Sequence, residues 1–399
     1  MGNMTGKHGG RAIGILTSGG DSPGMNAAIR AVVLAAREQG FKTLGIRRGY
    51  KGFCAGDWFL ITPESVEGIA RSGGTVLGSA RMEEFKEKDV RARAIAGART
   101  AGIEGLVVIG GDGSFAGARD VSEEGLPCIG IPGTIDNDIV CSEYTIGYDT
   151  ALNTVVKLAD TIADTAASHD RCVVLEIMGN MAGDLTLYGG LACGAAAVVL
   201  LEETCFGQEE AWSEEKGKTV PRFLPNPGEV TRINDSIARR ICAGKRAGQN
   251  SFLVLVAEGV TGKKDGFGST RYPGGAEAMA KAIEAATAET FGSAGRVETR
   301  AQILGYIQRG GDPTARDRVL AARMGDYAVR LLSQGRRNEV VILRGSEVTS
   351  IEIDEALRLQ REKRAGVNLS DYLNTEDRAL ARRLSICDLE NDAAAEGGV

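Results

Sequence analysis

Two short polar stretches, each directly after an apolar run, carry the residues of this sequence that could do chemistry. The stretch IGGDGSFAGA follows GLVVI, placing Asp112 between glycines and Ser114 two residues later. Glycine lets a polyphosphate approach the backbone, and a carboxylate beside it can hold a metal ion that neutralises phosphate oxygens. A tight turn with a capping aspartate is the alternative interpretation, and Ser114 is expected to cap the helix that follows.

The second stretch, IPGTIDNDI, also follows an apolar run and holds Thr134, Asp136 and Asp138. Two ionised carboxylates this close repel each other unless a metal or a basic group lies between them or they serve different tasks. One can serve a metal, while the other can receive the proton of an attacking hydroxyl, as in phosphoryl transfer to an alcohol. An Asx-turn with two solvated aspartates is the alternative.

Further anion-binding groups surround these carboxylates in the sequence. The stretch LTSGGDSPGMNAAIRAVV contains Gly19 and Gly20 between a strand and a helix predicted to begin near Pro23. Free N–H groups at such a helix start can bind phosphate, although a plain turn remains possible. Four arginines are either surface ion pairs or phosphate-binding forks, namely Arg81, Arg171, Arg300 and Arg309. The chain has two histidines, His8 and His169, which poorly support histidine-based nucleophilic catalysis.

The elements that must position these residues follow from the apolar pattern. Buried parallel strands are predicted at 12–16, 105–110, 128–132, 172–177, 252–257 and 340–343. Helical patterns lie between them, the clearest over 150–168, where apolar residues form one stripe. The fold class is therefore α/β, with two doubly wound domains whose mainly parallel sheets are covered by helices and bind ligands at the carboxyl ends of strands.

Length and composition limit the possible functions. The 399 residues exceed the usual size of one domain, so we expect two. A net charge of −6 argues against a nucleic-acid surface, because binding the phosphate backbone needs a basic face. No apolar stretch reaches the ~20 residues of a membrane span, which favours a cytoplasmic protein without a membrane partner. The eight scattered cysteines contain no C-x-x-C pair, so buried thiols are predicted.

Seven motifs occur in an order that resembles the 6-phosphofructokinase family, ATP-dependent type. The most specific of them are GGDGS, PGTIDND and QRGG at matching distances, and the others are LTSGGDSPGMNAAIR, GGTVLGSAR, YTIGYDTAL and EIMG…GDLTL. The resemblance covers roughly Ala12 to Leu332 and is interrupted by a charged, proline-rich segment, Gly207 to Gly228, read as an inserted surface loop. It implies transfer of phosphate from ATP to the 1-hydroxyl of fructose 6-phosphate, in glycolysis.

The resemblance also implies roles for individual residues. It places Asp136 as the base for the sugar hydroxyl and Asp112 as the ligand of a Mg²⁺ cofactor. The catalytic set would be Asp136, Thr134, Asp138, Arg81 and Gly20. The nucleotide would be lined by Gly20, Tyr50, Arg81, Met82, Gly113, Ser114 and Gly117. The fructose 6-phosphate pocket would comprise Thr134, Asp136, Arg171, Met178, Gly179, Glu258, Arg300, Tyr306 and Arg309.

The same resemblance implies a domain plan and an assembly. Residues 1–147 would form a nucleotide-binding domain completed by about 308–345, and residues 148–307 a sugar-phosphate domain containing the 207–228 insertion. Residues 346–399 would be a C-terminal extension. A homotetramer, or a homodimer, would share its active sites, with Arg171 and Arg300 donated across a subunit interface.

Two departures from the bacterial family pattern bear on the sugar site. Tyr306 stands where histidine is usual, and Asn180 stands where arginine is common. The donor is also open to question, because the family uses either ATP or pyrophosphate. Pyrophosphate-dependent relatives typically carry aspartate and lysine at the positions of Gly113 and Gly133, so the glycines favour ATP. A pyrophosphate-dependent enzyme or a related sugar-phosphate kinase remains the alternative.

Two other classes of protein agree less well with the sequence. A dinucleotide-dependent oxidoreductase would also have glycine loops, but the first strand–helix turn lacks G-x-G-x-x-G. A catalytically silent regulatory subunit should have lost Asp112, Asp136 or Arg309, and all three are present.

Overall fold

The structure, a computed structural model, describes residues 11–180, 182–200, 205–213, 218–225, 227–258, 260, 275–291, 295–364 and 375–384. The chain divides into two compact units. The first comprises Met1–Ala151 and Arg309–Val367, and the second comprises Leu152–Gln308 and Asn368–Val399. Residues 346–367, predicted as part of a C-terminal extension, thus belong to the first unit. His8 and the last fifteen residues, 385–399, lie outside the described residues.

The first unit is built on a seven-stranded sheet in the order β13-β12-β5-β4-β1-β2-β3. Its strands are β1 (Ala12–Thr17), β2 (Lys42–Ile46), β3 (Trp58–Ile61), β4 (Ile103–Gly110), β5 (Cys128–Pro132), β12 (Glu339–Arg344) and β13 (Glu347–Glu352). The strands pair in parallel except at the two edges, where β3 and β13 are antiparallel to their neighbours. The predicted mainly parallel sheet is confirmed.

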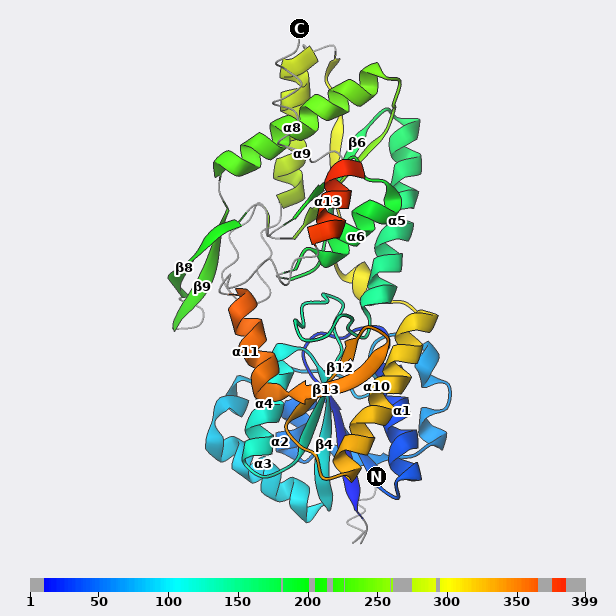
Figure 1. Cartoon of the computed structure of the whole chain (residues 1–399), viewed down its shortest axis with the longest axis vertical. Helices are drawn as coiled ribbons and strands as arrows, with labels where there is room; N and C mark the ends of the chain where they lie inside the picture. The colour runs from blue at the N-terminus through cyan, green and yellow to red at the C-terminus, as the bar shows by residue number, and fades with distance from the viewer. Residues whose placement is uncertain are drawn as a thin grey trace. The chain divides into compact units, whose positions relative to one another are not determined.

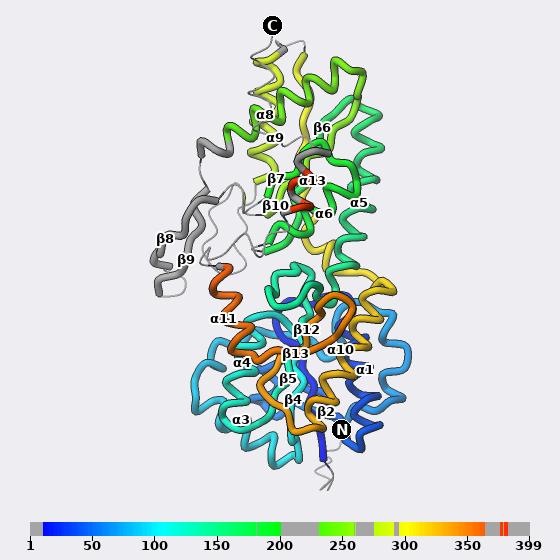
Figure 2. Tube along the Cα trace, in the orientation of Figure 1, coloured from blue at the N-terminus to red at the C-terminus, as the bar shows by residue number. Residues whose placement is uncertain are grey.

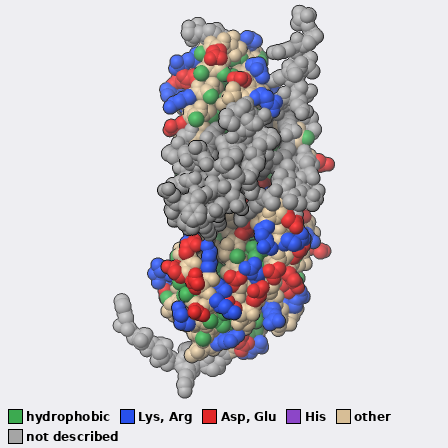
Figure 3. All heavy atoms as spheres, turned by 90° about the vertical axis from the view of Figure 1, so that its left-hand side faces the viewer, with side chains coloured by type: hydrophobic (Ala, Val, Ile, Leu, Met, Phe, Trp, Pro, Cys, Tyr) green, Lys and Arg blue, Asp and Glu red, His purple; other side chains and the backbone are tan. Residues whose placement is uncertain are grey.

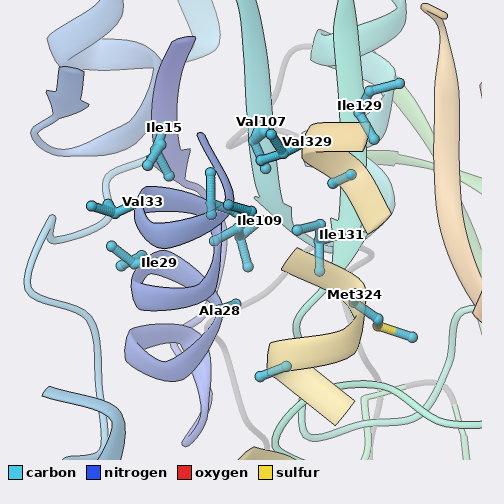
Figure 4. Close-up of a cluster of buried hydrophobic side chains, with 14 of the residues drawn as sticks. Ile15, Ala28, Ile29, Val33, Val107, Ile109, Ile129, Ile131, Met324 and Val329 are labelled. Atoms are coloured by element: carbon cyan, nitrogen blue, oxygen red, sulfur yellow. The ribbon is translucent and has the colours of Figure 1, made fainter. Parts of the chain in front are cut away.

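Helices cover both faces of this sheet (Figure 1). One face carries α1 (Met25–Glu38) and α10 (Ala315–Ser333); the other carries α2 (Gly49–Ala55), α3 (Lys88–Thr100), α4 (Asp112–Glu123) and α11 (Ile353–Arg364). Short 3-10 helices connect them, η1 (Glu64–Val66), η2 (Ile69–Arg71) and η3 (Glu83–Lys86). Alternate residues of β4 point to opposite cores: Val107 and Ile109 to the α1/α10 side (Figure 4), Leu106 and Val108 to the other. Burial on both faces is why these strands are continuously apolar.

The second unit contains a four-stranded, all-parallel sheet in the order β11-β6-β10-β7. Its strands are β6 (Cys172–Ile177), β7 (Ala197–Val199), β10 (Phe252–Ala257) and β11 (Thr299–Ile303), located in Figure 2 by β6, β7 and β10. Its helices are α6 (Asp184–Cys193), α8 (Pro227–Arg246), α9 (Gly275–Phe291), η5 (Gly305–Arg309) and α13 (Thr375–Leu384). Helix α5 (Tyr148–Ser168) confirms the predicted helix, and Val155, Ala159 and Ala166 of its stripe are buried.

The segment predicted as an inserted surface loop is a β-hairpin, so that prediction was wrong. Strands β8 (Cys205–Ser213) and β9 (Lys218–Pro225) pair antiparallel with each other, in a sheet of two strands. Such a ribbon is held by backbone hydrogen bonds between its strands, and it needs no apolar face to form the pairing. The charged and proline-rich composition therefore concealed the strands.

The described surface gives further outcomes of the sequence predictions. Lys and Arg are interspersed with Asp and Glu over the described face in Figure 3. Across the described ranges, no helix is long and apolar enough to cross a membrane. Buried thiols are confirmed at Cys128, Cys141, Cys172 and Cys242, whereas Cys54 and Cys193 are half-buried, and burial raises the pKa of each of these two thiols to about 11.

Helices α1 and α10 approach closely at Gly325. A Cβ there would lie 2.6 Å from Ala31 Cβ and 3.1 Å from Ala28 O, which leaves no space for a methyl group. We expect Gly325→Ala to lower the free energy of unfolding by about 1–3 kcal/mol through overpacking. Gly97 in α3 is the matched control, because a Cβ there meets only Trp58, at 3.6 Å. Gly97→Ala should leave stability unchanged or raise it by about 0.5–1 kcal/mol. Urea denaturation of both variants measures the difference, and equal stabilities would contradict it.

Candidate functional site

The three motif loops of the first unit meet at the carboxyl edge of its sheet. Strands β1, β4 and β5 are neighbours, so the loops after them are adjacent. Backbone hydrogen bonds join them directly: Ser18 N–H donates to Ile109 O at 3.0 Å, and Gly133 N–H donates to Gly110 O at 3.0 Å. The structure thus brings together the stretches that the sequence marked as chemically capable.

The first glycine loop and the GGDGS loop interlock through Ser114. Its Oγ donates to Ser18 O at 3.0 Å, and both groups fill the space where Gly110 would carry a Cβ. The prediction that Ser114 caps α4 was wrong: the N-cap residue is Gly111, without a side-chain cap, and Ser114 bonds across to the neighbouring loop instead. Helix α1 begins at Met25, behind the N-cap residue Gly24 at φ 113°.

Tyr50 and Gly117 form a packed support behind this loop. Tyr50 is buried, its hydroxyl donates to Ser114 O at 2.6 Å, and its ring stacks on Phe85 at a centroid distance of 4.1 Å. A Cβ on Gly117 would lie 2.8 Å from the Tyr50 ring, so the glycine is required by this packing. Burial raises the pKa of Tyr50, which keeps its hydroxyl a donor. Met82 is half-buried against the same cluster.

The aspartate loop after β5 is compact and buried. Thr134, Asp136 and Asp138 are each less than a tenth exposed. Asp136 N–H donates to Thr134 Oγ1 at 3.2 Å, and the same hydroxyl lies 3.4 Å from Asp136 Oδ2. Asn137 adopts a left-handed conformation, φ 51°, and its Oδ1 accepts from Thr145 N–H at 3.1 Å. The tight turn separates Asp136 from Asp138 and holds the Asp136 backbone against Thr134.

The segment that carries Arg81 is fixed at its other end by Asn26 of α1. The Asn26 amide donates to Ser72 O and Gly73 O at 3.1 and 3.0 Å and accepts from Val76 N–H at 2.8 Å. Ser79 Oγ then donates to Gly19 O at 2.5 Å. Arg81 itself is exposed, at the end of this anchored segment.

Arg309 lies against the first glycine loop. Its Nη1 donates to Asp21 O at 3.2 Å, and a Cβ on Gly20 would be 2.8 Å from that nitrogen. Gly20 is exposed, so its missing side chain leaves the guanidinium close to an accessible backbone. Gly20 and Arg309, both predicted for the site, therefore lie against each other.

Asp112 is the residue of this edge that suits a metal ion. It is half-buried in the first turn of α4, beside exposed Gly113, whose Cβ position meets nothing within 4 Å. Within the described part of the chain, no group of three or more His, Cys, Asp or Glu side chains could hold a metal. The Asp112 carboxylate is an oxygen ligand of the kind that Mg²⁺ takes, commonly one or two carboxylates with phosphate oxygens and water completing the shell.

In the second unit, two buried side chains shape the loop after β6. Gln308 Oε1 accepts from Met178 N–H at 2.9 Å, while Glu258 Oε1 accepts from Gly179 N–H at 3.3 Å and Asn180 N–H at 2.6 Å. Asn180 has a positive φ of 53°. Met178, Gly179 and Glu258, predicted as one pocket, are thus brought together.

The other residues predicted for the sugar site in the second unit are Arg171, Arg300 and Tyr306, of which Tyr306 lies in η5 with Gln308. Arg171 and Arg300 both pair with Glu298, the first at 2.9 Å, and the hydrogen bond from Arg171 is the main cause that lowers the pKa of Glu298. Tyr306 is 78% exposed, next to Ile307 at 62%.

Sequence reasoning missed the residues that hold the loops, among them Gln308, Asn26 and Thr145. Each is a polar residue inside or beside a quoted motif. Gln308 and Asn26 bond to backbone 130 and 46–50 residues away in the chain, and Thr145 bonds to Thr134, 11 residues before it. The glutamine next to Arg309 in QRGG was the available signal for Gln308.

Comparisons with known proteins agree on one family. A family profile described as phosphofructokinase matches residues 12–332. An ATP-dependent 6-phosphofructokinase of Clostridium botulinum (strain Eklund 17B / Type B) is 42% identical over 350 residues, which cover 88% of this chain and 95% of that protein. The protein of the same name from strain Loch Maree / Type A3 is 42% identical over 351 residues, with the same coverage.

Solved structures give the same fold. Phosphofructokinase from Saccharomyces cerevisiae superposes with a TM-score of 0.72 at 27% identity, covering 95% of this chain and 49% of that one. A pyrophosphate-dependent phosphofructokinase from Marinobacter aquaeolei gives a TM-score of 0.67 at 19% identity, covering 87% and 83%, which supports the fold alone.

The Tyr50 hydrogen bond can be tested through stability. Tyr50→Phe removes the side-chain donor to Ser114 O, which keeps its place in the hydrogen-bond ladder of α4, so we expect a loss of about 0.5–1.5 kcal/mol in the free energy of unfolding. Tyr327→Phe is the control, because that half-exposed hydroxyl makes no hydrogen bond within the described residues, and its change should stay within about 0.5 kcal/mol. Thermal and urea denaturation measure both. Equal effects would remove Tyr50 from this supporting role.

Proposed function

The chain belongs to the phosphofructokinase family, as the order of its motifs predicted, and on that premise we propose that it phosphorylates fructose 6-phosphate with ATP. The sugar 1-hydroxyl oxygen attacks the γ-phosphorus, the bond to the β–γ bridging oxygen breaks, and ADP leaves with that electron pair. The products are fructose 1,6-bisphosphate and ADP. The hydroxyl proton passes to Asp136.

One observation supports this proposal most: the buried Thr134–Asp138 loop and the loop that carries Asp112 begin side by side, where Gly133 N–H donates to Gly110 O at the ends of β5 and β4. A base for an alcohol and a carboxylate for a phosphate-bound metal are thereby held on adjacent loops. Phosphoryl transfer needs little more than such positioning and charge stabilisation. The dinucleotide-dependent oxidoreductase would have no use for the aspartate loop.

On the nucleotide side, we assign contact with phosphate to Gly20, Gly113 and Arg81, with Thr134 and Asp138 completing the loop around the base. Asp112 would hold Mg²⁺, which when bound neutralises charge on the phosphate oxygens. Tyr50, Gly117 and Ser114 act through packing and hydrogen bonds, because Tyr50 and Ser114 are buried and engaged with each other.

On the sugar side, we assign sugar-phosphate contacts in the second unit to the Met178–Gly179 loop, Glu258 and Tyr306, and in the first unit to Arg309. We further propose a homotetramer, or a homodimer, in which Arg171 and Arg300 leave Glu298 to serve the sugar phosphate of a neighbouring subunit. We also propose a glycolytic role in the cytoplasm, which the name of the relatives, ATP-dependent 6-phosphofructokinase, supports.

ATP is favoured over pyrophosphate as donor by two independent points. The curated relatives at 42% identity are named ATP-dependent. The open space at Gly113 also leaves room beside the first turn of α4 for a donor larger than pyrophosphate. A coupled assay for fructose 1,6-bisphosphate with each donor tests the proposal, and no product with either would overturn it.

The base is tested by Asp136→Asn, which keeps the size of the side chain and removes its proton affinity. We expect kcat to fall by about 10²–10⁴ while the melting temperature changes little, because a positioned base contributes that range. Steady-state kinetics and thermal denaturation provide the two measurements. A kcat within threefold of the parent would remove Asp136 from this role.

The donor site is tested at Gly113, where a new side chain meets no protein atom within 4 Å. Gly113→Asp should raise the KM for ATP about tenfold or more, because a carboxylate beside the α-phosphate repels it, while the fructose 6-phosphate KM stays fixed. Gly113→Ala is the matched control for bulk alone and should raise it less. A parent enzyme that works faster with pyrophosphate than with ATP would contradict the donor assignment, whatever the variants do.

A further inference from the structure

A buried carboxylate joins two helix starts in the first unit. Asp317, in the first turn of α10, is completely buried. Its Oδ1 accepts from Gly147 N–H at 2.9 Å, and its Oδ2 accepts from Thr150 N–H at 2.8 Å and Thr150 Oγ1–H at 2.5 Å. Gly147 and Thr150 lie at the start of α5, so Asp317 provides the N-terminal cap that this helix would otherwise lack.

The arrangement is reciprocal. Thr314, the N-cap of α10, accepts at Oγ1 from Asp317 N–H at 3.3 Å and donates from the same hydroxyl to Asp149 Oδ2 at 2.7 Å. Thr314 N–H donates in turn to Thr150 Oγ1 at 3.0 Å. We call these five residues the α5–α10 clamp: Gly147, Asp149, Thr150, Thr314 and Asp317. At each helix start, backbone N–H groups donate hydrogen bonds to side chains from the start of the other helix.

The clamp continues into the aspartate loop through two backbone hydrogen bonds and the Thr145 hydroxyl. Next to Gly147, Ile146 O accepts from Thr134 N–H at 3.1 Å, and Ile146 N–H donates to Pro132 O at 3.0 Å. Thr145 Oγ1 donates to Thr134 O at 2.7 Å. Both backbone polar groups of Thr134 are therefore bonded to the two residues that precede Gly147.

Opposing effects act on the charge of the Asp317 carboxylate. Burial raises the pKa of Asp317, and the hydrogen bonds from Thr150 and Gly147 oppose that rise. The positive end of the α5 dipole also favours a negative charge there. An asparagine of the same shape would present an NH₂ group to at least one of these N–H donors, so the clamp requires an acceptor on both oxygens.

We propose that Asp317 is a positioning residue for the Thr134–Asp138 loop, acting through Gly147 and Thr150 to fix the backbone on which Asp136 is held. The proposal rests on the proposed function for its kinetic consequence only. Its structural consequence, a fixed loop, does not depend on which substrate is used.

The kinetic test compares Asp317→Asn with a matched pair at Thr150. Thr150→Val removes the hydroxyl bonded to Asp317 and Thr314, whereas Thr150→Ser keeps it. Asp326→Asn, on the exposed side of α10, controls for loss of charge.

We expect Asp317→Asn and Thr150→Val to lower kcat about 10- to 100-fold with the KM for ATP within threefold, because a small displacement of a reacting group lowers the rate by about that factor. Thr150→Ser and Asp326→Asn should stay within threefold of the parent. Rates are expressed per ATP-binding site titrated with a fluorescent ATP analogue, so that unfolded protein is not counted.

Hydrogen exchange of the peptide that spans residues 132–147 provides a second readout without substrate. We expect faster exchange in Asp317→Asn and Thr150→Val and parental exchange in Thr150→Ser. If the parent does not phosphorylate fructose 6-phosphate, the proposed function fails while this readout still decides the clamp. If Asp317→Asn does not fold, the Thr150 pair decides. Unchanged kcat and unchanged exchange in folded Asp317→Asn, or in Thr150→Val, would overturn the proposal.

Discussion

The functional edge of the first unit depends on loops that touch backbone to backbone. A Cβ at Gly110 would lie 2.4 Å from Ser18 O, and a Cβ at Gly73 would lie 2.3 Å from Gly311 O. Because no side chain separates these loops, their carbonyls must find donors at the contacts themselves. Ser114 and Ser79 supply them by donating to Ser18 O and Gly19 O. A displacement of one loop is therefore transmitted directly to the next.

Each unit also uses one buried carboxylate to gather backbone N–H groups. Asp317 accepts from Gly147 and Thr150, and Glu258 accepts from Gly179 and Asn180. In both cases the carboxylate comes from a distant part of the chain and fixes a segment that would otherwise have free donors. A hydrogen bond to a charged acceptor is about twice as strong as a neutral one, which suits positions where a loop must not move. The same physical solution therefore serves both the aspartate loop and the loop after β6.

The sequence predicted the interior strands β1, β4, β5, β12, β6 and β10 and the residues of the glycine and aspartate loops, because both signals are local. It did not name β2 or the edge strands β3, β7, β11 and β13, which are short or partly exposed and so lack a continuous apolar run. A strand buried on both faces is an apolar run, and a loop that binds phosphate needs glycine and carboxylate side by side. The residues that hold those loops were missed, since the partners of Gln308 and Asp317 lie 130 and 170 residues away. The β8–β9 hairpin was missed because its strands pair only with each other and their charged, proline-rich sequence lacks the apolar pattern by which strands are predicted. Ser114 was identified, but its actual acceptor, Ser18 O, lies on a different loop.

The glycines of GGDGSFAG differ in what surrounds the position of a Cβ atom. Gly110 and Gly117 lack side chains because the protein itself fills the space, with Ser18 and Ser114 at the first and the Tyr50 ring at the second. Any residue larger than glycine at these two positions would displace packed atoms, whatever ligand is bound. Gly113 differs, since its Cβ position meets nothing within 4 Å and the residue is exposed. No protein contact within 4 Å requires a glycine there, so the packing that fixes Gly110 and Gly117 does not account for Gly113.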